Sequence, residues 1–445
     1  MADLPLLRNH GVGTVIAYRD QRPVGVDDFL RHVVQLAAAL PERRHVLNLC
    51  TDRYRFTVGF AAALVRGQVS LLPPNLAPGS IGELSRCYPE VYCLTDGAAE
   101  YPALETVFFP QTPDGEPGAL AIPEIPELQV AAILFTSGST GRPLPHGKSW
   151  RSLCAGACAE ADRLGLPARS GMTVLGTVPP QHMYGLESTV LLPMQNGLAL
   201  HAGRPFFPAD VCAELETLPR PRALVTTPVH LRALLAESSA APPVDFLLSA
   251  TAPLSPQLAA EAEARFSAPL YEIYGCTEAG QVALRRTART PEWRAHPGLA
   301  LRQDERGTWV RGGHVETEVL LADVIELRDR DEFLLHGRTA DLVNVAGKRT
   351  SLANLNYHLN SIEGVRDGAF VIPEEDGRAV TRLTAFVVAP GLSSETIMNA
   401  LRQRIDAAFL PRPLHFVESL PRNATGKLPR EALSELVSAR EGKAG

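Results

Sequence analysis

A run of hydroxyl and glycine residues follows a short apolar segment in this 445-residue chain. The apolar segment, residues 130–135, is typical of a buried parallel strand. The residues after it are Thr136, Ser137, Gly138, Ser139, Thr140 and Gly141. Glycines allow a tight turn and close approach to a ligand, while hydroxyl and main-chain N–H groups can donate to phosphate oxygens. The pattern predicts a phosphate-binding loop, with an ordinary strand–helix turn as the alternative.

A second phosphate-binding pattern overlaps this stretch. Gly147, Lys148 and Ser149 match the end of a Walker A motif, whose first glycine belongs five residues before the second. That position holds Arg142, and Gly141 lies one residue too early. The mismatch disfavours a Walker-type ATPase, which stays open as an alternative.

A hydroxyl and a carboxylate stand side by side further along the chain. The preceding residues predict a strand that ends at Tyr274, after which Gly275 turns the chain. Thr277 and Glu278 would then project beyond the strand end. A phosphate and its Mg²⁺ could bind there, because Mg²⁺ takes few carboxylates together with substrate oxygens. A solvated Thr-Glu pair in a turn is the alternative.

Two later groups are also candidates. Asp323 precedes Arg338 by fifteen residues, and a carboxylate that accepts both ribose hydroxyls is a common way to hold a nucleotide. A lone aspartate at a strand end is more often a cap or turn residue. Lys427 follows a Thr-Gly turn between two arginines, and a solvated basic loop is the alternative for it.

Two weaker patterns could line a substrate pocket. His182, Tyr184 and Gly185 follow a Val-Pro-Pro segment, and a satisfied surface histidine is the alternative for His182. The second pattern is a segment of small residues after an expected strand, namely Ser249, Ala250, Thr251, Ala252 and Pro253.

In this order the motifs resemble those of the acyl-adenylate-forming superfamily of acyl-CoA synthetases, nonribosomal adenylation domains and luciferases. The loop resembles Thr-Ser-Gly-(Ser/Thr)-Thr-Gly-x-Pro, residues 274–278 resemble Tyr-Gly-x-Thr-Glu, and residues 421–430 resemble Pro-Arg-x-x-x-Gly-Lys-x-x-Arg. The resemblance covers roughly residues 25–435. It implies ATP- and Mg²⁺-dependent conversion of a carboxylic acid to acyl-AMP and pyrophosphate. Transfer to the pantetheine thiol of an acyl carrier protein or CoA would follow.

The resemblance also implies a role for each motif. Thr277 would contact the α-phosphate and Glu278 would hold the metal. Lys427 would bridge the substrate carboxylate and the α-phosphate, and His182 would gate the acyl pocket. Besides the phosphate loop, the implied nucleotide-binding residues are Thr251, Ala252, Pro253, Tyr274, Gly275, Asp323 and Arg338. The implied acyl-pocket residues are His182, Tyr184, Gly185, Ser249, Ala250 and Tyr274.

The chain departs from the superfamily pattern in two places that affect the site. The usual Lys-Gly after the loop is replaced by Leu144-Pro, and we expect Lys148 to supply the missing positive charge toward the β- and γ-phosphates. Ala250 and Thr251 replace two glycines, so their side chains should take room from the substrate pocket.

The elements that must position these residues alternate between strands and helices. The expected strands lie at 45–50, 69–72, 91–95, 130–135, 174–178, 223–226, 246–249 and 270–274. The expected helices lie at 26–40, 56–66, 228–236 and 255–266, with another from about 150. This order predicts an α/β fold whose parallel sheets are covered by helices and whose ligands collect at the carboxyl ends of the strands.

The pattern changes in the last third of the chain. Residues 314–335 alternate apolar and charged side chains, which predicts a small β subdomain, and residues from 352 onward predict a small α+β domain. We expect a core domain at 1–339 and a C-terminal domain at 340–445. The resemblance implies that the latter is a mobile lid, with Ala340 at the usual Asp or Lys of the hinge.

Only about 130 residues precede the loop, and a Pro-His-x-Lys-x-Trp run follows it. These features resemble the compact ligases of xanthomonadin and aryl-polyene pigment clusters, which load a hydroxybenzoate onto an acyl carrier protein. The resemblance implies 4-hydroxybenzoate or a related acid as substrate. The alternatives are a medium- or long-chain acyl-CoA synthetase and a catalytically silent nucleotide-binding protein.

Composition sets wider limits on function. The chain is 45% hydrophobic and 21% charged with a formal net charge of −6, which argues against a general nucleic-acid binder. No run of about 18 apolar residues predicts a membrane span, and the first residues do not form a signal peptide. The seven cysteines lack paired metal-ligand spacing. We expect reduced, buried thiols in a cytoplasmic protein.

Overall fold

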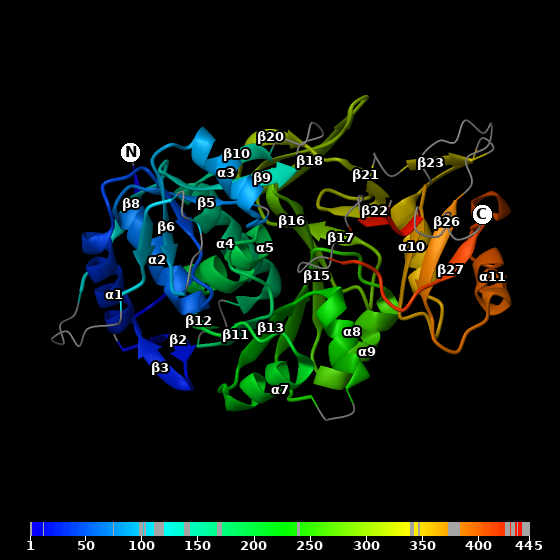
Figure 1. Cartoon of the computed structure of the whole chain (residues 1–445), viewed down its shortest axis with the longest axis horizontal. Coiled ribbons are helices and arrows are strands. Elements are labelled where there is room, and N and C mark those ends of the chain that lie inside the picture. The colour runs from blue at the N-terminus through cyan, green and yellow to red at the C-terminus, as the bar shows by residue number, and fades with distance from the viewer. Residues whose placement is uncertain are drawn as a thin grey trace.

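The computed structural model describes residues 2–11, 13–73, 75–97, 101, 104–110, 120–137, 143–166, 171–237, 241–338, 342–345, 348–372, 383–422, 428, 432–433 and 435–437. Two large sheets and their helices form the main body, and a smaller group of strands and helices follows at the C-terminal end of the chain (Figure 1).

A six-stranded sheet carries the strand that leads into the predicted phosphate loop. Its order is β10-β9-β5-β4-β6-β7, and all neighbours are parallel except β9 and β10. The strands are β4 (His45–Asn48), β5 (Val69–Leu72), β6 (Val91–Thr95), β7 (Thr106–Phe108), β9 (Val130–Ser137) and β10 (Pro143–Ser149). The predicted phosphate loop therefore joins two strands of an antiparallel hairpin, and the expected helix begins after β10 at Trp150.

An eleven-stranded sheet carries the motifs around Ser249, Tyr274 and Asp323, in the order β21-β22-β17-β16-β15-β14-β13-β11-β12-β2-β3. The strands from β15 to β2 are parallel, so their carboxyl ends lie at one edge. The bounds are β2 (Val15–Arg19), β3 (Arg22–Gly25), β11 (Thr173–Gly176), β12 (Ala199–His201), β13 (Arg222–Thr226), β14 (Phe246–Ser249), β15 (Leu270–Cys276), β16 (Gly280–Arg285), β17 (Trp293–Ala295), β21 (Asp323–Leu327) and β22 (Glu332–Arg338).

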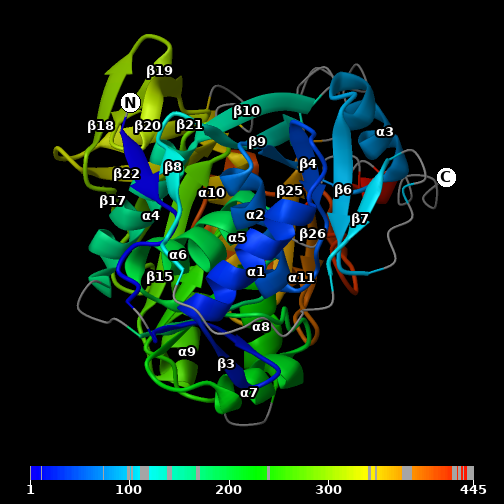
Figure 2. The same cartoon turned by 90° about the vertical axis from the view of Figure 1, so that its left-hand side faces the viewer.

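Helices cover the sheets, and α1 and α2 pack side by side (Figure 2). Side-chain caps begin four of them. For example, Asp52 accepts the N–H of Arg55 in α2, and Ser149 accepts the N–H of Ser152 in α4. The helices are α1 (Val26–Ala39), α2 (Arg53–Val65), α3 (Pro78–Cys87), α4 (Trp150–Leu164), α5 (Met183–Leu186), the π-helix η2 (Glu187–Leu191), α6 (Leu192–Asn196), α7 (Pro208–Thr217), α8 (Pro228–Ala236) and α9 (Pro256–Phe266).

A buried arginine links helix α2 to the eleven-stranded sheet. Arg53, the first residue of α2, is fully buried and donates to the carbonyls of Gly176, Val178, His201 and Gly203. Its Nε donates to the hydroxyl of Thr189, 3.0 Å away. The guanidinium thereby ties the start of α2 to the carboxyl ends of β11 and β12.

The remaining elements form small sheets and the C-terminal domain. β1 (Asp3–Pro5) pairs with β8 (Glu124–Pro126), and β18 (Leu299–Asp304), β19 (Gly307–Gly312) and β20 (Val315–Leu320) form the β subdomain. The C-terminal elements are β23 (Leu342–Val345), β24 (Lys348–Ser351), α10 (Leu352–Asn360), β25 (Asp367–Val371), β26 (Thr384–Val388), α11 (Ser394–Arg402), η4 (Ala407–Phe409) and β27 (Leu414–Phe416).

The C-terminal elements have an apolar core of their own, built from residues between Val343 and Leu410. The expected domain boundary near residue 340, and Ala340 itself, lie outside the described residues. The β subdomain begins earlier than predicted, because β18 and β19 precede residue 314, while β21 and β22 of the expected stretch join the eleven-stranded sheet. Of the seven free cysteines, Cys87 is exposed, contrary to the expected burial. In the described part of the chain, no helix has the length and apolar character to cross a bilayer.

Candidate active site

The β9–β10 and β15–β16 hairpins meet at Glu278. Oγ1 of Thr136, where the predicted phosphate loop begins, lies 3.0 Å from Nε2 of His146. The same Nε2 lies 3.8 Å from Oε1 of Glu278, whose side chain is 40% exposed. Two predicted motifs thus come together through His146, a residue that the sequence prediction did not include. Gly138, Ser139, Thr140, Gly141 and the side chain of Ser137 lie outside the described part of the chain.

Thr277 and Glu278 lie in the turn that connects β15 to β16. Gly275 pairs with Gln281 inside the hairpin, so the strand continues past Tyr274 rather than ending there as expected. A Cβ at Gly275 would overlap the carbonyl oxygen of Gly280. Glycine is therefore required where the two strands approach each other beneath the turn.

The residues of this turn suit Mg²⁺ bound together with a nucleotide. The described residues contain no cluster of three or more His, Cys, Asp or Glu that could hold a metal alone. Mg²⁺ does not need such a cluster, because it usually binds through one or two carboxylates together with phosphate oxygens and waters. Glu278 would therefore hold the ion jointly with the substrate.

Asp323, the residue predicted to bind the ribose, lies on β21 of the same sheet. The hydroxyl of Tyr274 donates to Oδ2 of Asp323 at 2.8 Å, and its ring packs against Trp293 and Phe333. Asp323 lies opposite Arg338 in the β21–β22 hairpin, and the side chain of Arg338 is outside the described part. The fifteen-residue spacing is therefore the spacing of a hairpin, and the ribose role of Asp323 stays a prediction.

The predicted acyl-pocket residues lie at the carboxyl ends of β13 and β14. Tyr184 is buried and its hydroxyl donates to the carbonyl of Thr226 at 3.1 Å. Ser249 ends β14 and is fully buried, and among the described residues its hydroxyl has no hydrogen-bond partner. His182 is half-buried at the start of α5. Gly185 has a packing role, because a Cβ there would overlap the carbonyl of Pro179.

The loop after β14 holds a threonine in a conformation that favours glycine. Thr251 has a φ of 79°, an outlier for a β-branched residue. The loop is anchored three residues later, where the N–H of Leu254 donates to Oε1 of Glu272 at 3.0 Å. Ala250 is buried, Ala252 is half-buried and Pro253 is exposed. The chain thus keeps a glycine-like backbone at 251 while placing a side chain there.

Lys148 lies beneath the Thr277–Glu278 turn. Its side chain is only 6% exposed, and Nζ donates to the main-chain carbonyl of Glu278 at 2.6 Å. Burial lowers the pKa of this lysine, while the nearby charge of Glu187 opposes the shift. The predicted contact of Lys148 with the β- and γ-phosphates stays a prediction.

A buried polar cluster continues from there into the core. Gln281 donates its main-chain N–H to Oε1 of Glu187 at 3.4 Å and its side-chain amide to Oε2 of Glu160 at 2.9 Å. Ser188 donates to Oε1 of Glu160 at 2.8 Å. Burial raises the pKa of Glu160 to about 7, and burial together with the charge of Glu160 raises the pKa of Glu187 to about 8. Sequence reasoning did not find this cluster.

The predicted catalytic lysine, Lys427, lies outside the described residues, but the segment leading to it is placed. Arg422 forms a two-pronged ion pair with Asp367 at 2.7 and 2.8 Å. The charges of both residues act on Arg232, a half-buried residue of α8 in the main body. Arg422 and Asp367 of the C-terminal domain therefore lie near α8.

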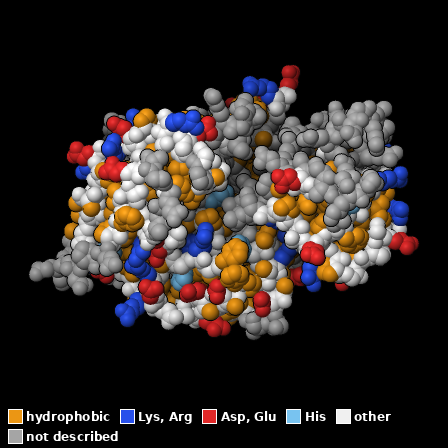
Figure 3. All heavy atoms as spheres, viewed as in Figure 1, with side chains coloured by type: hydrophobic (Ala, Val, Ile, Leu, Met, Phe, Trp, Pro, Cys, Tyr) orange, Lys and Arg blue, Asp and Glu red, His pale blue; other side chains and the backbone are white. Residues whose placement is uncertain are grey.

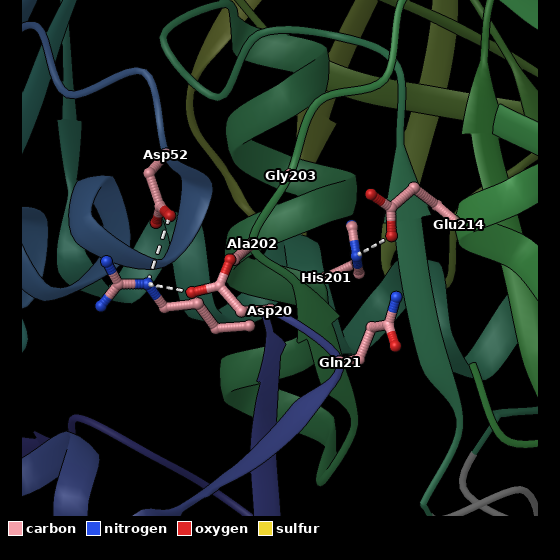
Figure 4. A pocket seen from close by; sticks show the side chains of 8 residues that line it. Asp20, Gln21, Asp52, His201, Ala202, Gly203 and Glu214 are labelled. Carbon is pink, nitrogen blue, oxygen red and sulfur yellow. Dashed lines mark ion pairs between the residues drawn. The ribbon is translucent and has the colours of Figure 1, made fainter. Parts of the chain in front are cut away.

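A hollow of about 390 Å³ lies away from these motifs, near the β2–β3 turn and the end of β12 (Figure 4). Its charged groups are paired with one another. Nε of Arg19 lies 3.9 Å from Asp20 and 3.6 Å from Asp52, and His201 lies 3.1 Å from Glu214. None of the predicted site residues lines this hollow.

Comparison with known proteins agrees with the motifs. A family model described as AMP-binding enzyme matches residues 32–305, and a model of the AMP-binding enzyme C-terminal domain matches residues 359–427. The chain belongs to the AMP-binding enzyme family. It is an enzyme of the acid–thiol ligase class, and the two-domain α/β fold predicted from the sequence is confirmed.

Several curated relatives of this AMP-binding enzyme are named as CoA ligases. A 4-coumarate–CoA ligase of Rhodobacter capsulatus is 30% identical over 300 residues, which are 66% of this chain and 74% of the relative. A 3-hydroxybenzoate–CoA/4-hydroxybenzoate–CoA ligase of Thauera aromatica is 27% identical and covers 97% of this chain and 89% of its own length. The O-succinylbenzoate coenzyme A synthetase of Bacillus subtilis, solved with ATP and magnesium ion, superposes with a TM-score of 0.80 at 17% identity. The superposition covers 97% of this chain and 99% of that chain.

Replacing Thr251 by glycine and by alanine should separate backbone strain from side-chain contacts. Both variants lose the hydroxyl, but only alanine keeps a Cβ in the left-handed conformation. We expect Thr251→Gly to be more stable than Thr251→Ala by about 1 kcal/mol in urea unfolding. Equal stability, or a more stable alanine variant, would mean that residue 251 is not held at positive φ in solution.

The contribution of Glu160 to the stability of the enzyme should fall as the pH rises from about 4.5 to about 7. In this window the unfolded chain releases the proton of Glu160, while the folded protein keeps it because burial raises the pKa to about 7. Glu160→Gln should remove a loss on the order of 2–3 kcal/mol, so the unfolding midpoint of the variant should rise relative to that of the wild type across this window. Glu261→Gln, at an exposed position of α9, is the control. Parallel pH profiles for the wild type and Glu160→Gln would contradict the assignment.

Proposed function

We propose that this enzyme activates a small aromatic acid of the hydroxybenzoate class with ATP and transfers the acyl group to a pantetheine thiol. The observation that carries the proposal is the meeting of the two hairpins at Glu278. The start of the phosphate loop at Thr136 reaches Glu278 through His146. On the same hairpin as Glu278, Tyr274 contacts the candidate ribose-binding Asp323. The residues predicted to bind phosphate, metal and ribose could therefore all bind one nucleotide.

The proposed reaction has two balanced steps. A carboxylate oxygen of the acid attacks the α-phosphorus of ATP in line, the bond to pyrophosphate breaks, and acyl-AMP forms. A thiolate sulfur then attacks the acyl carbon, and AMP leaves with the bonding electrons. Bound Mg²⁺ would neutralise phosphate charge, Thr277 would donate to an α-phosphate oxygen, and Lys427 would draw the two anions together. The protein thus contributes positioning and charge stabilisation rather than a nucleophile.

Two observations support a small acid. Ala250 and Thr251 place side chains where the superfamily has glycines, and the hydroxyl of Tyr184 is bound to the end of β13 at the same sheet edge. The relative that covers 97% of this chain is named for 3- and 4-hydroxybenzoate. We therefore take 4-hydroxybenzoate or a close analogue as the substrate, and a medium- or long-chain fatty acid as the second candidate.

We propose a pantetheine thiol, which CoA and acyl carrier proteins share, as the acceptor of the acyl group. The names of the relatives specify CoA. A carrier protein, which the narrower resemblance predicts, is acidic and would favour a basic surface. On the face shown in Figure 3, however, acidic and basic side chains of the described residues are interspersed. CoA is therefore the acceptor to test first, with a carrier protein as the comparison.

ATP–pyrophosphate exchange should separate the candidate substrates. With 4-hydroxybenzoate, 3-hydroxybenzoate, 4-coumarate, octanoate and palmitate each supplied with Mg²⁺ and ATP, we expect exchange to be fastest with a hydroxybenzoate. Exchange with fatty acids alone would retain the adenylation chemistry and reject the substrate class. Release of ADP and phosphate without exchange would instead support a Walker-type ATPase. Nucleotide binding without turnover of any acid would support a silent binding protein.

Replacing Lys427 by alanine should affect the two half-reactions differently. We expect exchange to fall on the order of 100-fold, because the positive charge that draws the carboxylate to the α-phosphate is gone. Thioester formation from supplied acyl-AMP should stay within about threefold of wild type. Lys348→Ala, which removes an exposed lysine of the C-terminal domain, is the control. Equal loss of both half-reactions would count against the role of Lys427.

A further inference from the structure

Two side chains from one face of β10 reach Glu278. His146 and Lys148 are two residues apart on the strand, so both point to the same side of it. Nε2 of His146 lies 3.8 Å from the Glu278 carboxylate, and Nζ of Lys148 donates to the Glu278 main-chain carbonyl at 2.6 Å. β10 therefore contacts both the side chain and the main chain of a single residue in the neighbouring hairpin.

Lys148 is buried beneath the turn that carries Glu278 and holds its main chain through a hydrogen bond. A lysine that is only 6% exposed is costly unless its ammonium group has partners that replace water. The carbonyl of Glu278 accepts its hydrogen bond, and the carboxyl of Glu187 lies near enough to favour the charged lysine. Glu187 belongs to η2 and accepts the main-chain N–H of Gln281 in β16. Lys148 thus lies where β10, η2 and the β15–β16 hairpin converge.

The turn that carries Glu278 needs such a support. The register of the β15–β16 ladder shifts between Tyr274 and Gly275, and Gly280 on the other side of the turn has a φ of 80°. A bulge and two glycines leave the main chain between them with more conformational freedom than a regular hairpin has. A side-chain hydrogen bond to the carbonyl of Glu278 removes part of that freedom.

We propose that Lys148 is a positioning residue for the Thr277–Glu278 turn, holding the main chain of Glu278 so that its carboxylate is presented to a metal–nucleotide complex. The inference rests on the proposed function, which makes Glu278 the metal ligand. It differs from the direct phosphate contact expected from the sequence, because Lys148 acts here through Glu278. The two roles differ in their dependence on Mg²⁺.

The test measures nucleotide binding without chemistry. α,β-Methylene-ATP, which cannot transfer AMP, is titrated calorimetrically into the full-length enzyme with Mg²⁺ and with EDTA. The variants are Lys148→Met, which keeps the length and apolar stem but loses the donor and the charge, and Lys148→Arg, which keeps both in a different geometry. Lys348→Met is the matched control, because it removes an exposed lysine from β24. Thermal unfolding reports whether each variant is folded.

For Lys148→Met we expect binding in EDTA to stay within about twofold of wild type, while the gain in affinity on adding Mg²⁺ falls roughly 10–100-fold, as for other residues that orient a metal ligand. Lys148→Arg should retain more of the Mg²⁺ response. An equal loss with Mg²⁺ and with EDTA would assign Lys148 to the phosphates and overturn the proposal. Unchanged binding under both conditions would overturn it as well.

Two further outcomes are informative. If Lys148→Met does not fold, Lys148→Arg carries the same comparison, and an unaltered Mg²⁺ response in this variant would contradict a geometric role. If the wild-type enzyme itself shows no Mg²⁺-dependent binding of the analogue, this result contradicts the proposed function, whatever the role of Lys148. The two failures are therefore distinguishable.

Discussion

The buried guanidinium of Arg53 fixes the edge at which the site forms. Most buried charges in proteins are paired with an opposite charge, whereas Arg53 donates to four main-chain carbonyls and the hydroxyl of Thr189. The carbonyls come from the ends of β11 and β12 and the segments that follow them. A Cβ at Gly176 would lie 2.7 Å from the guanidinium, so this glycine makes the close approach possible. The arginine thereby holds in place the point at which the chain leaves β11 for the acyl-site residues.

The segment from Val178 to Leu191 is held by polar groups on two sides. Arg53 contacts Val178 and Thr189 on one side, and Ser188 and Glu187 join Glu160 and Gln281 on the other. Satisfied polar networks in a core specify geometry more narrowly than apolar packing does, because each hydrogen bond needs its partner in one place. This segment contains the π-helix η2, a feature often found at functional sites. The predicted acyl-pocket residues of this segment and the turn of Glu278 are therefore held by one set of hydrogen bonds.

The sequence predicted what depends on local pattern. Buried parallel strands have apolar runs, so β4, β5, β6 and β9 were predicted correctly. The structure explains the fifteen-residue spacing of Asp323 and Arg338, which lie opposite each other in a hairpin. β10 was missed, because an edge strand containing Pro, His, Gly and Lys lacks an apolar run. Glu160 was missed because a glutamate on an amphipathic helix is usually on the solvent side. The contacts of His146 with Thr136 and Glu278 could not be predicted, because these partners lie 10 and 132 residues away in sequence.

Thr251 has a backbone conformation that favours glycine, yet it carries a side chain. The φ of 79° is imposed by the surroundings, since β14 fixes the chain before it and the bond from Leu254 to Glu272 fixes the chain after it. A threonine at this point cannot relax to a β conformation without breaking one of these constraints. Its side chain must therefore project from a loop shaped for glycine, at the sheet edge where Ser249 and Tyr184 also lie. The fold thus tolerates a conformational cost of about 1–2 kcal/mol at Thr251. Under the proposed function, this side chain would take room from the acyl pocket, which would favour a short, flat acid over a long acyl chain.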